Sequence, residues 1–460
     1  MSLFYTPSDG VAADVIPFFW KGRYHLFYLK DYRDAAGHGE GTPWFHLSTT
    51  DFVTYEDHGE AIPRGASDEQ DLFIFTGCVV EHDGLFHIFY TGHNHHLREA
   101  GKPQEAIMHA TSTSPDLTAW TKDPANPILL ADPARYDIHD WRDPFVFWNE
   151  EAGAWWMLLA ARKLEGPQHR RGCVALATSP DLVTWAIQEP LWAPGLYVTH
   201  ECPDLFRIDD RWYLVYSTFS ERHVTHYRSA TSLAGPWLAP DDDQFDTRAW
   251  YAAKTASDGD RRFHFGWTAT REGDSDDGAW QWGGSIVVHE VTQQPDGALT
   301  VSIPEGVKAA AFAGARSVPD VTLAPGDGFA WQAVGPCGQR SAFAAEVSVE
   351  PGTRDVSVHL KASPTLDVSH LLRIEPRRGR VVFDRWPRPG DQPFVQERMF
   401  ATPDDRPVSL LIVREGTLVE AYVDGTLALS CRAYGDQEGD WALSVAEGAA
   451  TFREIRIANH

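Results

Sequence analysis

Cysteine, methionine and positive charge are all scarce in this 460-residue chain. It contains five cysteines and four methionines, and 65 acidic against 40 basic side chains leave a net charge of −25. The five cysteines are scattered, odd in number and without metal-ligand spacing, so they predict neither a disulfide framework nor a zinc site. The excess of acidic residues excludes nucleic acid and anionic membranes as partners and suits a neutral small molecule.

Long apolar runs and long helical patterns are also missing. The sequence has no apolar stretch of the length that crosses a bilayer, so no membrane partner is expected. The start, Met1 to Tyr5, shows no basic segment followed by an apolar one, as a secretory signal would. We therefore expect a cytoplasmic, reducing location, although a protein whose signal had been removed would show the same sequence.

Aromatic residues are abundant and recur in a repeat. Five segments each begin with a turn and continue as a short aromatic and β-branched run, which predicts a strand entered through a hairpin. They are 22–28, 83–90, 153–159, 210–216 and 260–267. A second marker falls between them, at 49–52, 114–120, 179–185 and 230–237. Two markers in each period predict four-stranded propeller blades, five in number. A large β-sandwich with coincidental aromatic strands is the alternative.

The pattern changes after residue 305. An alanine-rich stretch from Lys308 to Ala315 predicts a linker helix, and shorter alternating strands follow it. We expect an all-β chain with a five-bladed β-propeller over 1–305, a linker helix over 306–316 and a β-sandwich over 317–460. The sandwich is a candidate for packing on the propeller or for forming a homodimer.

Three acidic residues occupy the same place in this repeat. Asp14, Asp143 and Glu201 lie ten to twelve residues ahead of the aromatic strands of units one, three and four. In a propeller, equivalent positions on the innermost strands point into one central funnel, and converging carboxyl groups are what glycoside hydrolysis requires. Asp9 is a competing candidate for the nucleophile.

The same place in units two and five holds hydroxyl and aromatic residues. Thr76 follows Phe75 in the second unit, and Trp250 and Tyr251 stand in the fifth. Aromatic rings can contact the apolar face of a sugar while carboxylates bind its hydroxyls, so the partner is predicted to be a small carbohydrate.

Other candidate residues have structural explanations. Cys202 is interpreted as a packing residue, because no activating partner is evident in the sequence. The histidines His93, His95 and His96 stand on a predicted loop, and their spacing is not a metal-ligand pattern. We therefore predict no metal and no cofactor.

Several of these segments resemble motifs of glycoside hydrolase family 32, the β-fructofuranosidases. Residues 141–144 (WRDP) resemble the family's RDP motif, and 201–206 (ECPDLF) its EC motif. Residues 22–28 resemble GxYHLFYQ, 75–78 the FSGS segment, 250–254 the DFYAAQ segment and 418–434 the C-terminal sandwich. The order and spacing of these motifs extend over nearly the whole chain.

The resemblance implies a role for each residue. Asp14 would be the nucleophile, Glu201 the acid and base, and Asp143 the stabiliser of the transition state, with Arg142 beside it. Further substrate-binding residues would be Trp44, Phe75, Thr76, Trp250 and Tyr251. The implied activity is retaining hydrolysis of β-fructofuranosyl linkages in sucrose, fructo-oligosaccharides or fructans.

The chain departs from the family pattern around the nucleophile. The motif WMNDPNG is absent, and residues 11–17 read VAADVIP instead. Leu29 and Lys254 replace two glutamines of the family, so the chain resembles a divergent member. The spacing of Asp14 also suits the related five-bladed families 43 and 130. Three alternatives follow: a fructosyltransferase or difructose-anhydride enzyme, another furanosidase such as an arabinofuranosidase, and a non-catalytic sugar-binding protein.

Overall fold

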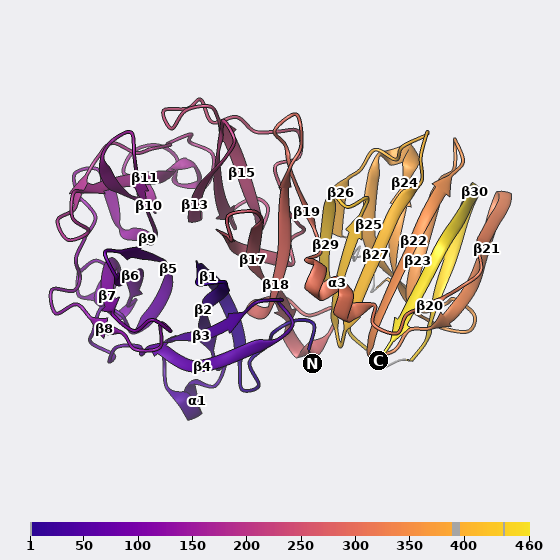
Figure 1. Ribbon diagram of the computed structural model, residues 1–460, viewed down its shortest axis with the longest axis horizontal. Coiled ribbons are helices and arrows are strands. Elements are labelled where there is room, and N and C mark those ends of the chain that lie inside the picture. Colours follow the sequence, from indigo (N-terminus) through magenta and orange to yellow (C-terminus); the bar gives the residue numbers. More distant parts are fainter. Residues whose placement is uncertain (1, 389–395, 436–437) are drawn as a thin grey trace.

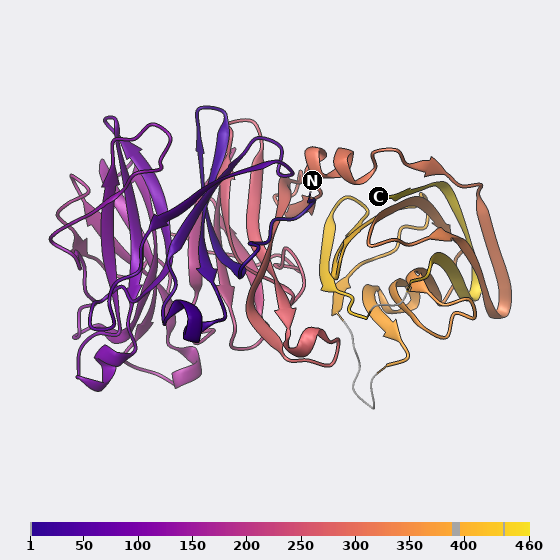
Figure 2. The ribbon, with the colours of Figure 1, turned by 90° about the horizontal axis from the view of Figure 1, so that it is seen from below.

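The computed structural model describes residues 2–388, 396–435 and 438–460. They form a ring of antiparallel sheets followed by a second, two-layered β unit, which lie side by side (Figure 1). Viewed at 90° to this, the two layers of the second unit are separate (Figure 2).

The first three blades are sheets of four antiparallel strands in chain order, which the repeat predicts. Blade 1 comprises β1 (Val11–Trp20), β2 (Arg23–Asp31), β3 (Trp44–Thr49) and β4 (Tyr55–Ile62). Blade 2 comprises β5 (Phe73–His82), β6 (Leu85–His93), β7 (Glu105–Ser112) and β8 (Thr121–Lys122). Blade 3 comprises β9 (Tyr136–Asn149), β10 (Ala154–Lys163), β11 (Gly172–Ser179) and β12 (Ala186–Ile187). Short helices occur in the connections: α1 (Ala35–His38), α2 (His96–Glu99) and a 3₁₀ turn at Gln168–Arg170.

The last two blades complete the ring. Blade 4 comprises β13 (Glu201–Ile208), β14 (Arg211–Thr218) and β15 (Val224–Ala230), and isolated bridges from β15 to Leu238 and Gln244 stand in place of a fourth strand. Blade 5 comprises β16 (Trp250–Ser257), β17 (Arg262–Arg271), β18 (Trp280–Gln293) and β19 (Leu299–Ser302), with a 3₁₀ turn at Glu272–Asp274. Pairing of β1 with β18, at Ala12 and Gly284, joins blades 1 and 5 into one sheet.

In blades 1 and 2, the first two strands are joined by two-residue turns whose second residue is glycine. Lys21 and Gly22 both have positive φ (47° and 80°), as do Asp83 and Gly84 (52° and 80°). Two successive residues with positive φ are typical of the type I′ turn, whose twist fits a two-residue β-hairpin. These turns fix the register of the innermost strands and so the position of the residues on them.

Helix α3 (Glu305–Ala311) leads from the propeller to the second unit. This unit comprises β20 (Arg316–Ser317), β21 (Val321–Pro336), β22 (Arg340–Val349), β23 (Asp355–Ala362), β24 (Ser369–Glu375), β25 (Arg380–Trp386), β26 (Gln396–Met399), β27 (Val408–Glu415), β28 (Leu418–Val423), β29 (Leu427–Arg432) and β30 (Asp440–Asn459), with a 3₁₀ turn at Pro376–Arg378. The long strand β30 belongs to both layers, because its first half pairs with β23 and its second half with β22. Apolar side chains such as Phe343, Trp441 and Leu443 fill the space between the layers. The expected fold, a five-bladed propeller followed by a β-sandwich, is confirmed.

The sandwich and the propeller share an apolar core and a buried polar network. Trp250 and Ile286 of the propeller belong to the same buried cluster as Leu418 and Tyr422 of the sandwich. Arg432 donates to the carbonyl oxygens of Thr268 (2.9 Å) and Ala269 (3.0 Å) and to Oγ of Ser285 (2.9 Å). The sandwich thus supplies hydrogen bonds to two main-chain carbonyl groups of blade 5. Within the described part of the chain, no helix has the length and apolar character needed to cross a membrane.

Candidate active site

Each of the five innermost strands carries one extra residue at the same level of the funnel. The register shifts by one residue at Asp14 in β1, at Thr76 in β5, at 143–144 in β9, at 202–203 in β13 and at 252–253 in β16. Three of these residues, Asp143, Cys202 and Ala252, have positive φ (60°, 49° and 54°). A β-bulge redirects the side chains beside it, and here five bulges direct one residue or its neighbour from each blade inward.

The three predicted carboxyl groups line one cavity of about 270 Å³. Asp14, Asp143 and Glu201 come from blades 1, 3 and 4, which are the blades that the repeat indicated. The remaining lining residues are Phe75, Arg142, Cys202, Phe219, His223, Tyr251, Ala252 and Trp282. The cavity is therefore lined by both acidic groups and aromatic rings.

Asp14 is held by three hydrogen-bond donors. Trp267 donates from Nε1 to Oδ1 at 2.9 Å, and the Thr76 hydroxyl donates to Oδ2. The Cys202 thiol also lies 3.8 Å from Oδ2. Burial raises the pKa of Asp14, and these donors oppose the shift because they stabilise the carboxylate.

Cys202 connects Asp14 to Asp143. Its backbone N–H donates to Oδ2 of Asp143 at 2.9 Å, while its thiol faces Asp14. Burial raises the pKa of Asp143 to about 7, the Arg142 charge opposes this, and the Glu201 charge adds to it. Burial also raises the pKa of the Cys202 thiol, with the Asp143 charge adding, so this thiol is a neutral donor and not a nucleophile.

Glu201 lies between a cation and a phenol. Nη2 of Arg142 donates to Oε1 at 2.9 Å, and the Tyr251 hydroxyl donates to Oε2 at 2.5 Å. Burial raises the pKa of Glu201, against the opposing effects of Arg142 and Tyr251. A carboxyl group whose pKa is raised by burial can hold a proton near neutral pH and donate it.

Arg142 is surrounded by carboxylates. Its guanidinium lies 3.0 Å from Asp140, 3.2 Å from Glu105 and 3.8 Å from Asp143, in addition to the Glu201 contact. The side chain is only 10% exposed. It acts as a central cation that lets several acidic groups share a small buried volume.

Two residues that the resemblance assigned to the sugar pocket lie elsewhere. Trp44 and Trp250 are fully buried, and their indole N–H groups donate to the carbonyl oxygens of Phe75 (3.1 Å) and Val287 (3.3 Å). Neither indole lines the cavity, which corrects that expectation. Thr76 is also fully buried, and its hydroxyl donates to Oδ2 of Asp14. The competing acid Asp9 lies outside the cavity and pairs with Lys30 at 2.6 Å.

The sequence did not indicate four aromatic residues of the site. Trp267 holds Asp14, and the ring of His223 stacks on Tyr251 at 3.7 Å between centroids. Phe219 and Trp282 also line the cavity, and they are 47% and 39% exposed. Large apolar side chains that remain exposed beside a cavity are typical of ligand contacts.

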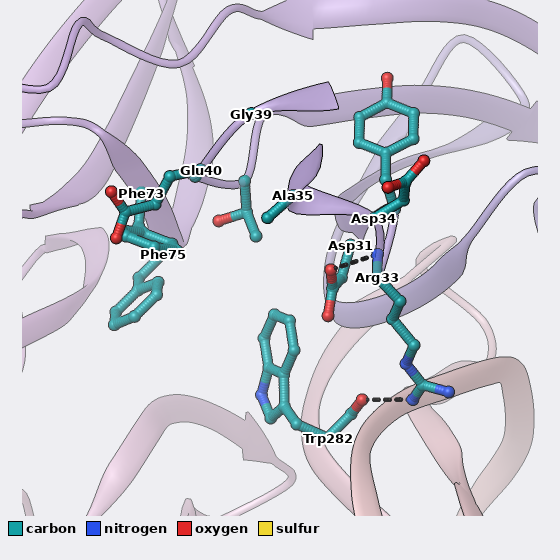
Figure 3. Close-up of a pocket in the computed structure, with 12 residues that line it drawn as sticks. Asp31, Arg33, Asp34, Ala35, Gly39, Glu40, Phe73, Phe75 and Trp282 are labelled. Atoms are coloured by element: carbon teal, nitrogen blue, oxygen red, sulfur yellow. Dashed lines mark hydrogen bonds between the residues drawn. The ribbon is translucent and has the colours of Figure 1, made fainter. Parts of the chain in front are cut away.

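A second cavity, of about 510 Å³, adjoins the first, and Phe75 and Trp282 line both. Figure 3 shows these two rings on its walls, with Asp31, Asp34 and Glu40 from blade 1 around it. The guanidinium of Arg33 donates to Trp282 O (2.7 Å) and Thr270 Oγ1 (2.7 Å). The two cavities are thus neighbours, and the three catalytic candidates line the smaller one.

Comparison with known proteins identifies the family. Residues 5–297 match the N-terminal domain of glycosyl hydrolases family 32, and the chain belongs to this family. Beta-fructofuranosidase, insoluble isoenzyme CWINV5, of Arabidopsis thaliana is 31% identical over 195 residues, which are 42% of this chain and 32% of that protein. Sucrose-6-phosphate hydrolase of Zymomonas mobilis is 29% identical over 236 residues, 48% of this chain and 44% of that protein. The matched segments thus span less than half of these two relatives.

Solved structures share the fold over nearly the whole chain. Fructan 1-exohydrolase IIa from Cichorium intybus has a TM-score of 0.81 at 17% identity, covering 99% of this chain and 96% of that one. Sucrose-6-phosphate hydrolase from Lactobacillus gasseri has a TM-score of 0.75 at 20% identity, covering 99% and 91%. At such identities the likeness concerns the fold.

Proposed function

We propose that this protein is a retaining glycoside hydrolase that cleaves β-fructofuranosyl linkages in sucrose, fructo-oligosaccharides or fructans. The observation that carries the proposal is the convergence of Asp14, Asp143 and Glu201 on one cavity of about 270 Å³, each with donors that fix its orientation. Membership of family 32 and relatives named as beta-fructofuranosidases support the substrate class.

Asp14 is the proposed nucleophile. Its carboxylate attacks the anomeric carbon of the fructosyl ring, the bond to the leaving oxygen breaks, and an ester joins Asp14 to the sugar. The donors from Trp267 and Thr76 favour the ionised form that this step requires. Water then displaces Asp14 from the same face as the first leaving group, so the configuration is retained.

Glu201 is the proposed acid and base. It protonates the leaving oxygen in the first step and removes a proton from the attacking water in the second. The two contacts to Arg142 and Tyr251 occupy different oxygens of this carboxyl group, which fixes its plane. Asp143 binds fructosyl hydroxyls and stabilises the positive charge that develops on the ring.

The direct test replaces each carboxyl group by its amide. Asp14→Asn and Glu201→Gln are expected to lower kcat for sucrose and inulin-type oligosaccharides by at least about 10²-fold, because each removes a group that makes or breaks bonds. Asp9→Asn is the matched control, since Asp9 lies outside the cavity, and its kcat should stay within a factor of a few. Undiminished hydrolysis by both cavity variants would refute the assignment.

A chemical rescue tests retention separately. With a fructoside whose leaving group needs no proton, Glu201→Gln still forms the ester on Asp14, and azide should then accelerate turnover and yield a β-fructosyl azide. An α-configured azide would show inversion and exclude the covalent intermediate.

A fructosyltransferase is the second candidate, and the outer cavity favours it. Its volume of about 510 Å³ accommodates a further sugar, which could take the place of water as acceptor. Product analysis at high sucrose concentration distinguishes the two: oligosaccharides longer than the substrate indicate transfer, and equal amounts of glucose and fructose without longer products indicate hydrolysis.

A further inference from the structure

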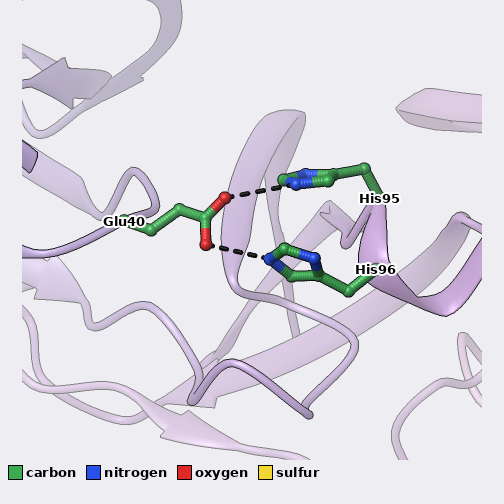
Figure 4. Close-up of side chains that lie close together, drawn as sticks. All are labelled: Glu40, His95 and His96. Carbon is green, nitrogen blue, oxygen red and sulfur yellow. Dashed lines mark hydrogen bonds and ion pairs between the residues drawn. The ribbon is translucent and has the colours of Figure 1, made fainter.

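Three possible metal ligands meet at the rim of the outer cavity. Oε1 of Glu40 lies 3.2 Å from Nε2 of His95, and Oε2 of Glu40 lies 2.9 Å from Nε2 of His96 (Figure 4). One ligand atom from each of the three residues lies within 4.8 Å of the others. The side chains are 42–47% exposed, so an ion in solution can reach them.

Two anchored loops from different blades present these residues. Asn94 is fully buried and donates from Nδ2 to Ser67 O (3.0 Å) and Glu69 O (2.7 Å), while its Oδ1 accepts the N–H of His96 (3.0 Å). These bonds hold the loop of blade 2 that carries both histidines. In blade 1, Arg64 donates to Gly41 O at 3.0 Å and to His38 O, which holds the loop around Glu40.

We propose that Glu40, His95 and His96 bind a divalent cation of the zinc type. Two imidazole nitrogens and one carboxylate oxygen suit Zn²⁺, which binds such atoms at about 2.0–2.2 Å. Each imidazole nitrogen lies 2.9 or 3.2 Å from a different oxygen of Glu40, so a small rotation of the carboxylate would bring one oxygen and both nitrogens around a common ion. Three protein ligands leave a fourth position for water or a ligand hydroxyl.

The ion would connect blades 1 and 2 beside the substrate space. Glu40 lines the outer cavity together with Phe73, whose ring lies 5.7 Å from that of His95. Figure 3 shows Glu40 and Phe73 on the same side of this cavity. Bound Zn²⁺ would cross-link the two loops and place a positive charge at the rim of a cavity that Asp31 and Asp34 also line.

This site cannot be recognised from residue spacing in the sequence. Glu40 precedes His96 by 56 residues, so the third ligand becomes evident only when the two blades are placed side by side. Without a metal, the His96 contact is a hydrogen bond to the Glu40 carboxylate, and the His95 contact is an ion-pair contact with the same group. The two states differ in a measurable way, because a metal site saturates with one ion per chain.

The test is a titration of the full chain, freed of metal with a chelator, with ZnCl₂ in a calorimeter. We expect one site per chain, and Glu40→Gln and His96→Ala should each weaken the Kd at least tenfold. His82→Ala is the matched control, because His82 is an exposed imidazole 3.6 Å from a single carboxylate, that of Asp83; its affinity should not change. All these side chains are at the surface, and circular dichroism verifies that the variants are folded.

Co²⁺ provides a second readout of the ligands. Its visible spectrum should show nitrogen and oxygen coordination without a thiolate band, since the five cysteines are buried. Zn²⁺ binding weaker than about 0.1 mM, or equal binding by Glu40→Gln and the wild type, would overturn the proposal, as would a thiolate band with Co²⁺.

Discussion

The hydroxyl of Tyr251 donates a hydrogen bond of 2.5 Å to Oε2 of Glu201. This bond stabilises the carboxylate and so lowers the pKa of Glu201 against the effect of burial. Tyr251→Phe removes the donor, and the pKa of Glu201 should rise. Because the proposed acid must be protonated, the basic limb of the kcat/KM profile should then move to higher pH. Profiles of both proteins between pH 4 and 9 measure the shift, and a basic limb that stays in place would argue against Glu201 as the acid.

Trp267 offers the complementary test at Asp14. Trp267→Phe removes the 2.9 Å bond to Oδ1 and should raise the pKa of Asp14, because the carboxylate loses a donor. The proposed nucleophile must be ionised, so here the acidic limb of the profile should move to higher pH while the basic limb remains. If the two variants shift the same limb, the division of roles between Asp14 and Glu201 is wrong.

Arg142 should be important for stability as well as for catalysis. Its replacement by Met leaves Glu105, Asp140, Asp143 and Glu201 without their common cation, and breaking a buried ion pair from one side costs about 3–5 kcal/mol of unfolding free energy. Arg142→Lys should lose less, because it keeps the charge. Denaturant titration measures these changes.

A surface pair serves as the comparison for Arg142. Arg23 pairs with Glu56 at 3.0 Å, and the two side chains are 41% and 63% exposed. Arg23→Met should change the unfolding free energy by less than about 1 kcal/mol. Equal losses in Arg142→Met and Arg23→Met would contradict the central role of Arg142.

The buried network between propeller and sandwich predicts a pH dependence of stability. Ser430 Oγ lies 2.5 Å from Asp246 Oδ2 and 2.7 Å from Glu420 Oε2. The hydroxyl has one proton and donates it to only one carboxyl group, so a protonated Glu420 completes the network. Burial and the Asp246 charge raise the pKa of Glu420 well above its usual range.

The sign of this effect follows from proton linkage. A group whose pKa is raised by folding contributes stability that is fully present below its unfolded pKa, about 4.3 for Glu, and is lost as the pH rises toward its folded pKa. Glu420→Gln keeps a donor for Ser430 and cannot ionise. The variant should therefore exceed the wild type in stability near pH 8, and this advantage should shrink toward pH 4.5. Thermal unfolding across that range tests it, and a constant difference would contradict a protonated Glu420.

The position of the acidic residues could be predicted because the repeat also sets the bulges. Asp14 and Asp143 stand at the bulges of blades 1 and 3, and Glu201 directly precedes the bulge of blade 4, so the repeat locates each acid to within one residue of this feature. The aromatic wall was less predictable. Trp250 and Tyr251 are neighbours on β16, and alternate residues of a strand face opposite sides. Only Tyr251 faces the cavity, while Trp250 packs toward the sandwich.

Residues in the loops gave no periodic signal. Phe219 and His223 lie between β14 and β15, and Trp282 lies near the start of β18, where the length and path of the chain differ from blade to blade. The role of Trp267 could not be predicted for another reason. It lies on β17, the second strand of blade 5 and not the innermost one, and its indole contacts Asp14 where blades 5 and 1 meet. Such contacts form only when the last blade of the propeller pairs with the first, and the local sequence does not indicate them.

The seam between β1 and β18 also determines what truncation would do. The strand that carries Asp14 belongs to the same sheet as β17 and β18, and Arg432 of the sandwich bonds to Thr268, Ala269 and Ser285 of these two strands. A chain ending before residue 316 would lack the sandwich, so the carbonyl groups of Thr268 and Ala269 and the hydroxyl of Ser285 would lose that donor. The sandwich therefore supports the sheet that carries the proposed nucleophile, although none of its described residues lines the cavity that holds Asp14.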